Sequence, residues 1–289
     1  MYYPVQQIAK RVSPAQALFM ANFLGDLEYI TYQKYNPGFT SFMNQITSDT
    51  PLEGRVEELK RKSLRQRHRA FITRIFYPVH QKTVPIDNIN YLKKYNNRGI
   101  CFPIFHFGLH YLSICSIQHA LTVPLYVISV LGVRKTDNPQ ELRFQRLKKV
   151  TVSKLDFTPI FDVNRFKTVC IPDVLTGKGC YMPMFDVAVK SSKRYPFLGS
   201  DIILSLKNTI KFTLKHSIPI ILFFTIKDEN DLARTVLEAP FETGPSDNIE
   251  SVETGILSIL ERYVLAYPGL VDWYAWWQNS LRFNRRFRA

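Results

Sequence analysis

Short apolar runs alternate with segments of helical periodicity from about residue 98 onward. The apolar runs predict buried strands at residues 99–105, 123–130, 158–163, 180–189 and 218–226. The segments between and after them predict helices at residues 109–120, 140–150, 165–175, 201–216 and 248–266. Such alternation is typical of a mostly parallel or mixed sheet that helices cover on both faces. We therefore expect an α/β fold.

Residues 1–35 precede this region and predict a helix. Ser13 suits the N-cap position and Pro14 the first turn. The apolar positions between Ala17 and Ile30 fit two interpretations: a helix packed on the domain core, or a helix that lies in a membrane interface between basic flanks. The tripeptide at residues 36–38, Asn-Pro-Gly, predicts a turn.

Residues 52–77 predict a second, strongly basic helix with an apolar side. A basic amphipathic helix is either a solvated face or a contact for an anionic partner. We expect residues 1–80 to form an N-terminal helical segment packed on the core. Residues 81–289 then form a single α/β domain, and both parts belong to one structural unit.

Composition places the chain among globular proteins, because 46% of its residues are hydrophobic and 13% are aromatic. The formal charge of +14 and the pI near 9.6 favour an anionic partner. Candidates are nucleic acid, an anionic membrane surface, an acidic carrier protein and a phosphorylated substrate. No nucleic-acid-binding motif accompanies the basic segments, so we expect no nucleic acid partner.

The four cysteines lie in apolar runs without metal-binding spacing, which predicts reduced core residues in a cytosolic protein. The N-terminus shows no basic region followed by an apolar stretch, so no signal peptide is expected. No apolar run approaches the roughly 20 residues of a membrane span. We expect a cytoplasmic protein.

Residues 102–113, FPIFHFGLHYLS, carry the strongest candidate for chemistry. The predicted strand ends on His106, Gly108 follows, and a helix begins directly afterwards. A histidine at the mouth of a strand, beside a helix N-terminus, is well placed for proton transfer. The structural alternative is a core histidine that hydrogen-bonds the backbone.

This stretch resembles the lysophospholipid acyltransferase superfamily, specifically its lipid A late-acyltransferase branch, which typically carries HFGNWEL. His106, Phe107, Gly108 and Leu112 match that motif, whereas Leu109, His110 and Tyr111 depart from it. Tyr111 stands at the position where the family motif has its acidic residue.

Further stretches resemble the same family in the same order. RYPFLG at residues 194–199, followed by a helix and SIPIIL at 217–222, is similar to the family's VPFFG and GAPVVPVF segments. YPGLVDWYAW at residues 267–276 is similar to its P-x-Q-W-x-W ending, and SPAQALFMANF to its opening helix. The resemblance therefore spans most of the chain.

The resemblance implies transfer of an acyl group from an acyl carrier protein or coenzyme A thioester to a hydroxyl or amine, without a bound cofactor. It implies His106 as the general base, with backbone N–H groups near Gly108 stabilising the oxyanion. Tyr111 is neutral near pH 7, with a reference pKa of about 10. Three explanations fit this departure. Tyr111 supports His106 through its hydroxyl, or a carboxylate from elsewhere, Asp186 or Asp201, replaces the missing acid. Otherwise the protein has lost the chemistry and only binds lipids or carriers.

Residues 190–194, KSSKR, form either an exposed basic loop or an anion clamp for a phosphate. The resemblance favours the clamp, with Lys193 and Arg194 as the phosphate contacts. Further expected substrate-binding positions are Gly108, His110, Phe197 and Gly199.

His106 and His110 have the i, i+4 spacing of a shared metal site, but no third ligand has suitable spacing, so we expect no metal. Trp273 and Trp276 predict packing against the core. The arginines that follow them predict contact with lipid headgroups.

We therefore expect an acyltransferase that lies peripherally on the cytoplasmic face of a membrane, with His106 and Tyr111 as its catalytic residues. A non-catalytic relative that binds lipids or carriers is the first alternative. An acyltransferase of a specialised-metabolite pathway, with an acceptor site altered at residues 109–111, is the second.

Overall fold

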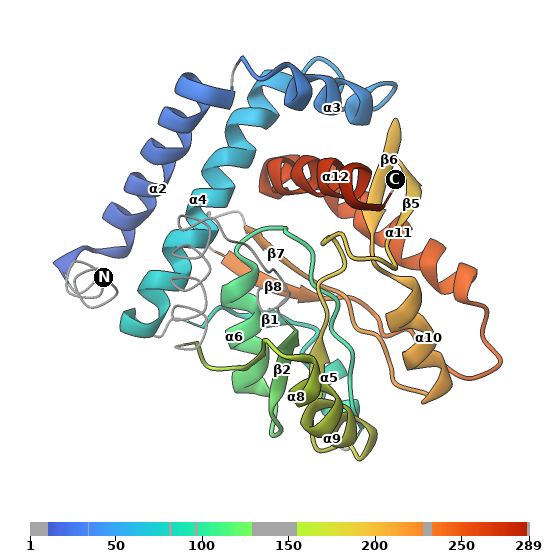
Figure 1. Cartoon of the computed structure of the whole chain (residues 1–289). Helices are drawn as coiled ribbons and strands as arrows, with labels where there is room; N and C mark the ends of the chain where they lie inside the picture. The colour runs from blue at the N-terminus through green and yellow to red at the C-terminus, as the bar shows by residue number, and fades with distance from the viewer. Residues whose placement is uncertain are drawn as a thin grey trace.

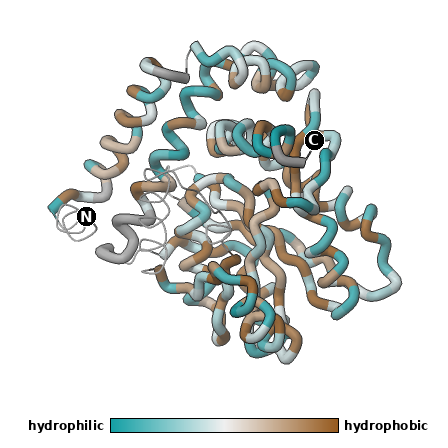
Figure 2. The backbone as a smooth tube through the Cα atoms, in the orientation of Figure 1, coloured by the Kyte–Doolittle hydropathy of each residue, from teal (hydrophilic) through white to brown (hydrophobic). Residues whose placement is uncertain are grey.

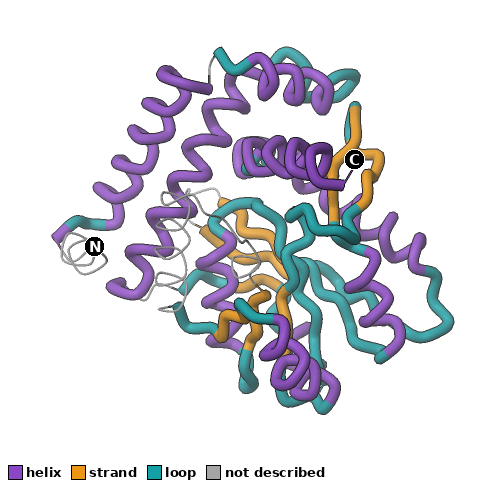
Figure 3. The backbone as a smooth tube through the Cα atoms, viewed as in Figure 1, coloured by secondary structure: helices purple, strands orange, loops and turns teal. Residues whose placement is uncertain are grey.

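The computed structural model describes residues 11–33, 35–80, 83–95, 98–128, 155–227 and 233–287 (Figure 1). The predicted helix at 140–150 lies outside these residues. Two three-stranded sheets form the centre, and helices surround them (Figure 3). The predicted α/β fold with N-terminal helices is confirmed.

One sheet is mixed and the other is parallel. The mixed sheet has the order β1-β8-β7, with β1 at Ile86–Asp87, β8 at Ala233–Leu237 and β7 at Phe223–Lys227. Strand β8 is parallel to β1 and antiparallel to β7. The parallel sheet has the order β3-β2-β4, with β3 at Thr158–Ile160, β2 at Leu125–Ile128 and β4 at Cys180–Met182.

The segment that precedes His106 joins these two sheets. Cys101 forms parallel bridges with Tyr181 on one side and with Ile220 on the other. The predicted strand at 99–105 is therefore extended and central, but its pairing is reduced to isolated bridges. Pro103 and its neighbours Pro183 and Pro219 explain this, because proline cannot donate a ladder hydrogen bond.

The N-terminal helices are α2 at Pro14–Glu28, the short π-helix η1 at Tyr29–Gln33, α3 at Pro37–Thr47 and α4 at Val56–His80. The Ser13 side chain accepts a hydrogen bond from the Gln16 N–H, and Gln16 reciprocates in a capping box, so the predicted N-cap is confirmed. The turn predicted at 36–38 is wrong in part. Asn36 caps α3, and Pro37 starts that helix.

Helix α2 packs on α4 at close range (Figure 1). A Cβ at Gly25 would lie 2.6 Å from the Cα of Arg65, so only glycine permits this approach. Asp26 binds the guanidinium groups of Arg61 and Arg65, each through two hydrogen bonds. Ala17 and Ala21 are buried, whereas the outer apolar side chains of α2 are exposed, namely Leu18, Phe19, Met20, Phe23, Leu24 and Leu27.

Besides α4, two helices pack around the site described below: α6 at His110–Ala120 and α12 at Trp273–Phe287. The other described helices are α5 at Asn90–Lys94, α8 at Val163–Arg165, the π-helix η3 at Phe166–Cys170, α9 at Ile171–Leu175, α10 at Lys207–Lys215, α11 at Ile249–Ala266 and the 3₁₀ helix η4 at Pro268–Leu270.

A hairpin replaces the first turn of one predicted helix. Strand β5 at Lys193–Phe197 pairs antiparallel with β6 at Ser200–Leu204 across a two-residue loop. The helix predicted at 201–216 is therefore wrong for its first residues, and α10 begins only at Lys207. Pairing with β5 explains this, and in the resulting strand Ile202, Ile203 and Leu204 are all buried.

The hydrophobic core of the protein lies at the sheets. Hydrophobic residues gather where the strands lie, and α4 carries mostly hydrophilic ones (Figure 2). Trp273 is completely buried and Trp276 is 4% exposed, so the predicted packing of both is confirmed. None of the helices among the described residues is long and apolar enough to cross a membrane.

Candidate active site

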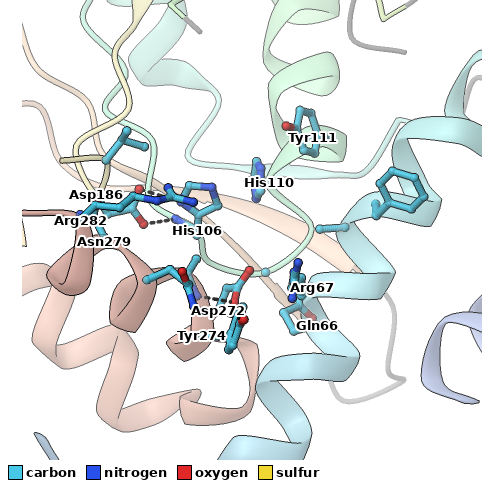
Figure 4. A pocket seen from close by; sticks show the side chains of 16 residues that line it. Gln66, Arg67, His106, His110, Tyr111, Asp186, Asp272, Tyr274, Asn279 and Arg282 are labelled. Atoms are coloured by element: carbon cyan, nitrogen blue, oxygen red, sulfur yellow. Dashed lines mark hydrogen bonds and ion pairs between the residues drawn. The ribbon is translucent and has the colours of Figure 1, made fainter. Parts of the chain in front are cut away.

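A cavity of about 220 Å³ opens beside His106, and helices α4, α6 and α12 contribute to its wall (Figure 4). We call it the histidine cavity. It lies where the central parallel segments end, which is the usual position of ligand sites in α/β sheets. Its polar and charged wall includes Gln66, Arg67, His106, His110, Tyr111, Asp186, Asp272, Tyr274, Gln278, Asn279 and Arg282.

Strand register brings His106 and Asp186 together. Cys101 pairs with Tyr181, and Ile104 pairs with Met184, both in parallel. Two residues further along each segment, the same register aligns His106 with Asp186. Their side chains meet, with 2.8 Å between His106 Nδ1 and Asp186 Oδ1. Asp186, one of the two acids that the sequence offered as a partner for His106, thus contacts the ring from a neighbouring segment.

Asp186 is held by further donors. Its Oδ2 accepts the backbone N–H of His106 at 2.5 Å and the indole N–H of Trp276 at 2.8 Å. The Asp186 side chain is 1% exposed, and that of His106 is 22% exposed. Because Nδ1 faces an acceptor, it carries the proton in the neutral ring. A proton from a substrate would then be taken at Nε2.

Asp272 is a second carboxyl group in the cavity wall, and the sequence interpretation missed it. Its Oδ1 accepts the Ala275 N–H at 2.9 Å, as an N-cap of α12 does, and its own N–H donates to the His106 carbonyl. Burial raises the pKa of Asp272, while His106 and Arg67 act against that increase. An Asp directly before a helix is the sequence signal for such a cap.

The turn between His106 and α6 depends on Gly108. Its φ is +57°, and a Cβ there would lie 2.1 Å from the Thr225 carbonyl oxygen. The Gly108 N–H itself donates to the Leu270 carbonyl at 2.8 Å. Oxyanion stabilisation by backbone N–H groups near Gly108 stays a prediction. Gly108, His110 and Tyr111 all line the cavity.

His110 and Tyr111 occupy the first turn of α6. The His110 ring is 5.6 Å from the His106 ring between centroids, and 4.3 Å from the Tyr111 ring. His110 is 5% exposed, and Tyr111 is partly buried. The predicted catalytic pair, His106 and Tyr111, therefore shares one cavity, and Asp186 binds the His106 ring there.

Two arginines also line the cavity. Arg67 comes from α4 and Arg282 from α12 (Figure 4). Arg67 Nη1 donates to Glu28 at 2.9 Å, and its guanidinium lies 4.7 Å from the centre of the Tyr274 ring. The sequence indicated anionic contacts for both basic segments, but it gave no sign that they meet at His106.

The predicted phosphate clamp lies elsewhere. Lys193 and Arg194 are exposed on β5 and do not line the histidine cavity. Arg194 Nη2 donates to Asn284 Oδ1 at 2.6 Å. Phe197 is buried against Trp276, and Gly199 packs on the end of α3, where a Cβ would lie 2.2 Å from the Ser48 carbonyl oxygen. Phe197 and Gly199 therefore have packing positions, outside the cavity.

Asp201, the other sequence candidate for the missing acid, is exposed on β6 and does not line the cavity. Within the part of the chain that the structure describes, no group of three or more His, Cys, Asp or Glu residues could hold a metal ion.

The cysteines have the environment of core residues. Cys101, Cys115, Cys170 and Cys180 are buried and form no disulfide. Burial raises the pKa of the Cys170 and Cys180 thiols to about 12 each. Thiols of this kind are inert as nucleophiles near neutral pH.

Taken together, the geometry provides a histidine whose tautomer is fixed by a buried carboxylate, beside a cavity whose wall carries arginines and carboxyl groups. Such a pair takes a proton from a hydroxyl or amine and stabilises the resulting imidazolium.

No protein-family model and no curated protein matches this chain.

Proposed function

We propose that this protein is an acyltransferase in which His106 is the general base and Asp186 orients it. The observation that carries the proposal is the contact of 2.8 Å between His106 Nδ1 and the buried Asp186 carboxylate, at the wall of a cavity. The resemblance of residues 102–113 to the lipid A late-acyltransferase branch supports the type of reaction. Asp186 fills the role that the family gives to the acid at Tyr111.

The reaction is a transfer between a thioester and a hydroxyl or amine. His106 Nε2 takes the acceptor proton while the acceptor oxygen or nitrogen bonds to the thioester carbonyl carbon. The tetrahedral oxyanion then collapses, the carbon–sulfur bond breaks, and the imidazolium returns the proton to the departing thiolate. Asp186 stabilises the imidazolium between these two steps.

The charges around the cavity support an anionic acyl donor or acceptor. Arg67 and Arg282 line the cavity together with Asp186 and Asp272, so the attraction comes chiefly from the whole chain, which carries a net charge of +14. An acyl carrier protein is acidic and coenzyme A is phosphorylated, so either donor is attracted electrostatically. The acceptor is a hydroxyl or amine compound, of a lipid or of a specialised metabolite.

We also propose that the outer face of α2 rests on an anionic membrane surface, at the cytoplasmic side. Phe19 is 71% exposed and Phe23 is 59% exposed, and Ile30 just beyond α2 is 60% exposed. Helix α4 beside α2 is rich in Arg and Lys. Exposed aromatic and aliphatic side chains next to basic residues are typical of interfacial helices on anionic lipids.

The test of acyl transfer is an incubation with an acyl carrier protein that bears a medium-chain thioester, with a panel of hydroxyl and amine acceptors. Intact mass spectrometry of the carrier follows loss of the acyl group. His106→Ala is the test variant. His119→Ala is the matched control, because His119 also pairs with a carboxylate, Asp156 at 3.2 Å, but is exposed and lies outside the cavity.

We expect wild type and His119→Ala to remove the acyl group and His106→Ala to leave it in place. Turnover by His106→Ala at the wild-type rate contradicts the proposal. Carrier binding without acyl loss by any form favours the alternative of a non-catalytic carrier-binding protein.

A further inference from the structure

Asp272 and Asp186 both place a carboxyl group in the wall of the histidine cavity (Figure 4). Asp186 already binds His106 Nδ1, the His106 N–H and the Trp276 indole N–H. Asp272 differs, because its Oδ1 accepts the Ala275 N–H while Oδ2 has no hydrogen-bond or ion-pair partner within the described part of the chain. Asp272 is 8% exposed, so Oδ2 is a nearly buried acceptor that a ligand in the cavity can use.

The start of α12 places Asp272 beside the candidate base. The Asp272 N–H donates to the His106 carbonyl at 2.9 Å, and the residues between them in this pairing, Phe107 and Val271, form an antiparallel bridge. The two segments therefore run side by side, and both side chains line one cavity (Figure 4). A group bound to Asp272 Oδ2 lies in the space that His106 also faces.

Capping of α12 does not account for the negative charge of Asp272. The neutral oxygen of Asn or Ser caps a helix about as well. Burial raises the pKa of Asp272, and it outweighs the nearby charges of His106 and Arg67 and the N-terminus of α12, which all favour the carboxylate. The buried charge therefore lowers the stability of the protein. A cation bound in the cavity would offset this loss.

Neither arginine of the cavity wall forms an ion pair with Asp272 among the described residues. Arg67 Nη1 donates to Glu28, which is not part of the cavity wall, and the guanidinium lies over the Tyr274 ring. Glu28 thus offsets much of the Arg67 charge from outside. The Asp272 carboxylate remains available to a ligand of positive charge.

We propose that the acceptor of the acyltransferase is an amine, and that Asp272 binds its ammonium group and takes the first proton before His106 takes the second. This inference rests on the proposed function for the transfer step, but ammonium binding is independent of turnover. It selects the amine from the two acceptor classes, and it makes Asp272 a substrate-binding and catalytic residue besides its role as a helix cap.

Two protons leave the acceptor nitrogen in this scheme. The ammonium gives the first to the Asp272 carboxylate and becomes a neutral amine with a lone pair. This nitrogen bonds to the thioester carbonyl carbon while His106 takes the second proton. The carbon–sulfur bond then breaks, and the imidazolium protonates the departing thiolate. Asp272 releases its proton to solvent, so the products are an amide, a thiol and one proton. An alcohol has one proton to lose and needs only His106.

The experiment compares acceptors that differ only in the reacting group: butylamine with butanol, and benzylamine with benzyl alcohol. Intact mass spectrometry of an octanoyl carrier protein gives kcat/KM, and isothermal titration calorimetry measures acceptor binding without turnover. Asp272→Asn removes the charge and keeps an oxygen for the α12 cap, and Asp272→Ser is a second variant that also caps a helix. Asp201→Asn is the matched control, because Asp201 is exposed on β6 outside the cavity.

We expect wild type and Asp201→Asn to bind and acylate the amines in preference to the alcohols. Both Asp272 variants should lose at least about 10-fold in amine affinity and in kcat/KM for the amines, and less than about 2-fold for the alcohols. A purely structural role of Asp272 would lower both acceptor classes equally. That result, or a wild-type preference for the alcohols, would overturn the assignment.

Failure of the two proposals is distinguishable. If wild type binds the amines more tightly than the alcohols, the Asp272 variants lose this preference and no acceptor is acylated, the ammonium site stands and acyl transfer fails. If His106 acylates alcohols while amines are neither bound nor acylated, the proposed function stands and Asp272 is only a helix cap. Neither amine binding nor acyl loss would contradict both proposals.

Discussion

Replacing Asp186 by Asn is the sharpest single perturbation of the candidate site, because it preserves shape while it removes the negative charge and reverses the hydrogen bond to His106. Oδ2 accepts two donors, the His106 N–H and the Trp276 indole N–H. The Asn carbonyl oxygen keeps both if it takes this position. The amide NH₂ then faces His106 Nδ1, which must become the acceptor. The proton moves to Nε2, where the general base needs a lone pair.

The expected magnitude follows from this wrong tautomer. Loss of the carboxylate that orients a catalytic histidine lowers turnover about 10⁴-fold in a serine protease. That factor corresponds to about 5 kcal/mol of transition-state stabilisation. The cost in folding free energy should be much smaller, about 1 kcal/mol, because two of the three hydrogen bonds to residue 186 persist.

The assay is acyl loss from the carrier under single-turnover conditions, with urea denaturation as the stability control. Asp201→Asn is the matched variant, because Asp201 is exposed on β6 and outside the cavity. Tyr111→Phe tests the alternative partner inside the cavity. Turnover of Asp186→Asn within 10-fold of wild type would refute the role of Asp186. A larger loss in Tyr111→Phe would transfer that role to Tyr111.

Gly108→Ala should destabilise the protein by about 2 kcal/mol or more in urea denaturation, because φ is +57° and the Thr225 carbonyl blocks a Cβ. Asp272→Asn should raise Tm at pH 7 and lose this advantage in acid. Burial raises the pKa of Asp272, so its carboxylate lowers stability fully above the raised pKa, and this cost disappears as the pH falls to the ordinary pKa of Asp. Replacing Phe19, Phe23 and Leu27 together by Ser should weaken sedimentation with phosphatidylglycerol vesicles without lowering Tm, since all three are exposed; unchanged sedimentation would contradict membrane contact through α2.

Local sequence patterns predicted the structure correctly wherever the interactions that stabilise an element lie close together in the chain. The Ser13 cap, the helices after Leu109 and Asn248, and the buried positions of Trp273 and Trp276 all follow from such patterns. The local pattern predicted a helix at residues 201–204, but these residues form a strand because they pair with β5. Cross-strand pairing joins separate segments, so periodicity within one segment does not reveal it.

The sequence by itself determined the α/β class, the position of His106 at the end of an apolar segment, and the absence of an acid at Tyr111. Only the tertiary structure selected Asp186 from the candidate acids, because the parallel register at Cys101 and Ile104 aligns residues that lie 80 positions apart. It likewise brought Gln66 of α4 to the His106 cavity. Register and helix docking depend on packing between distant segments, and no local pattern encodes the partner of a given side chain.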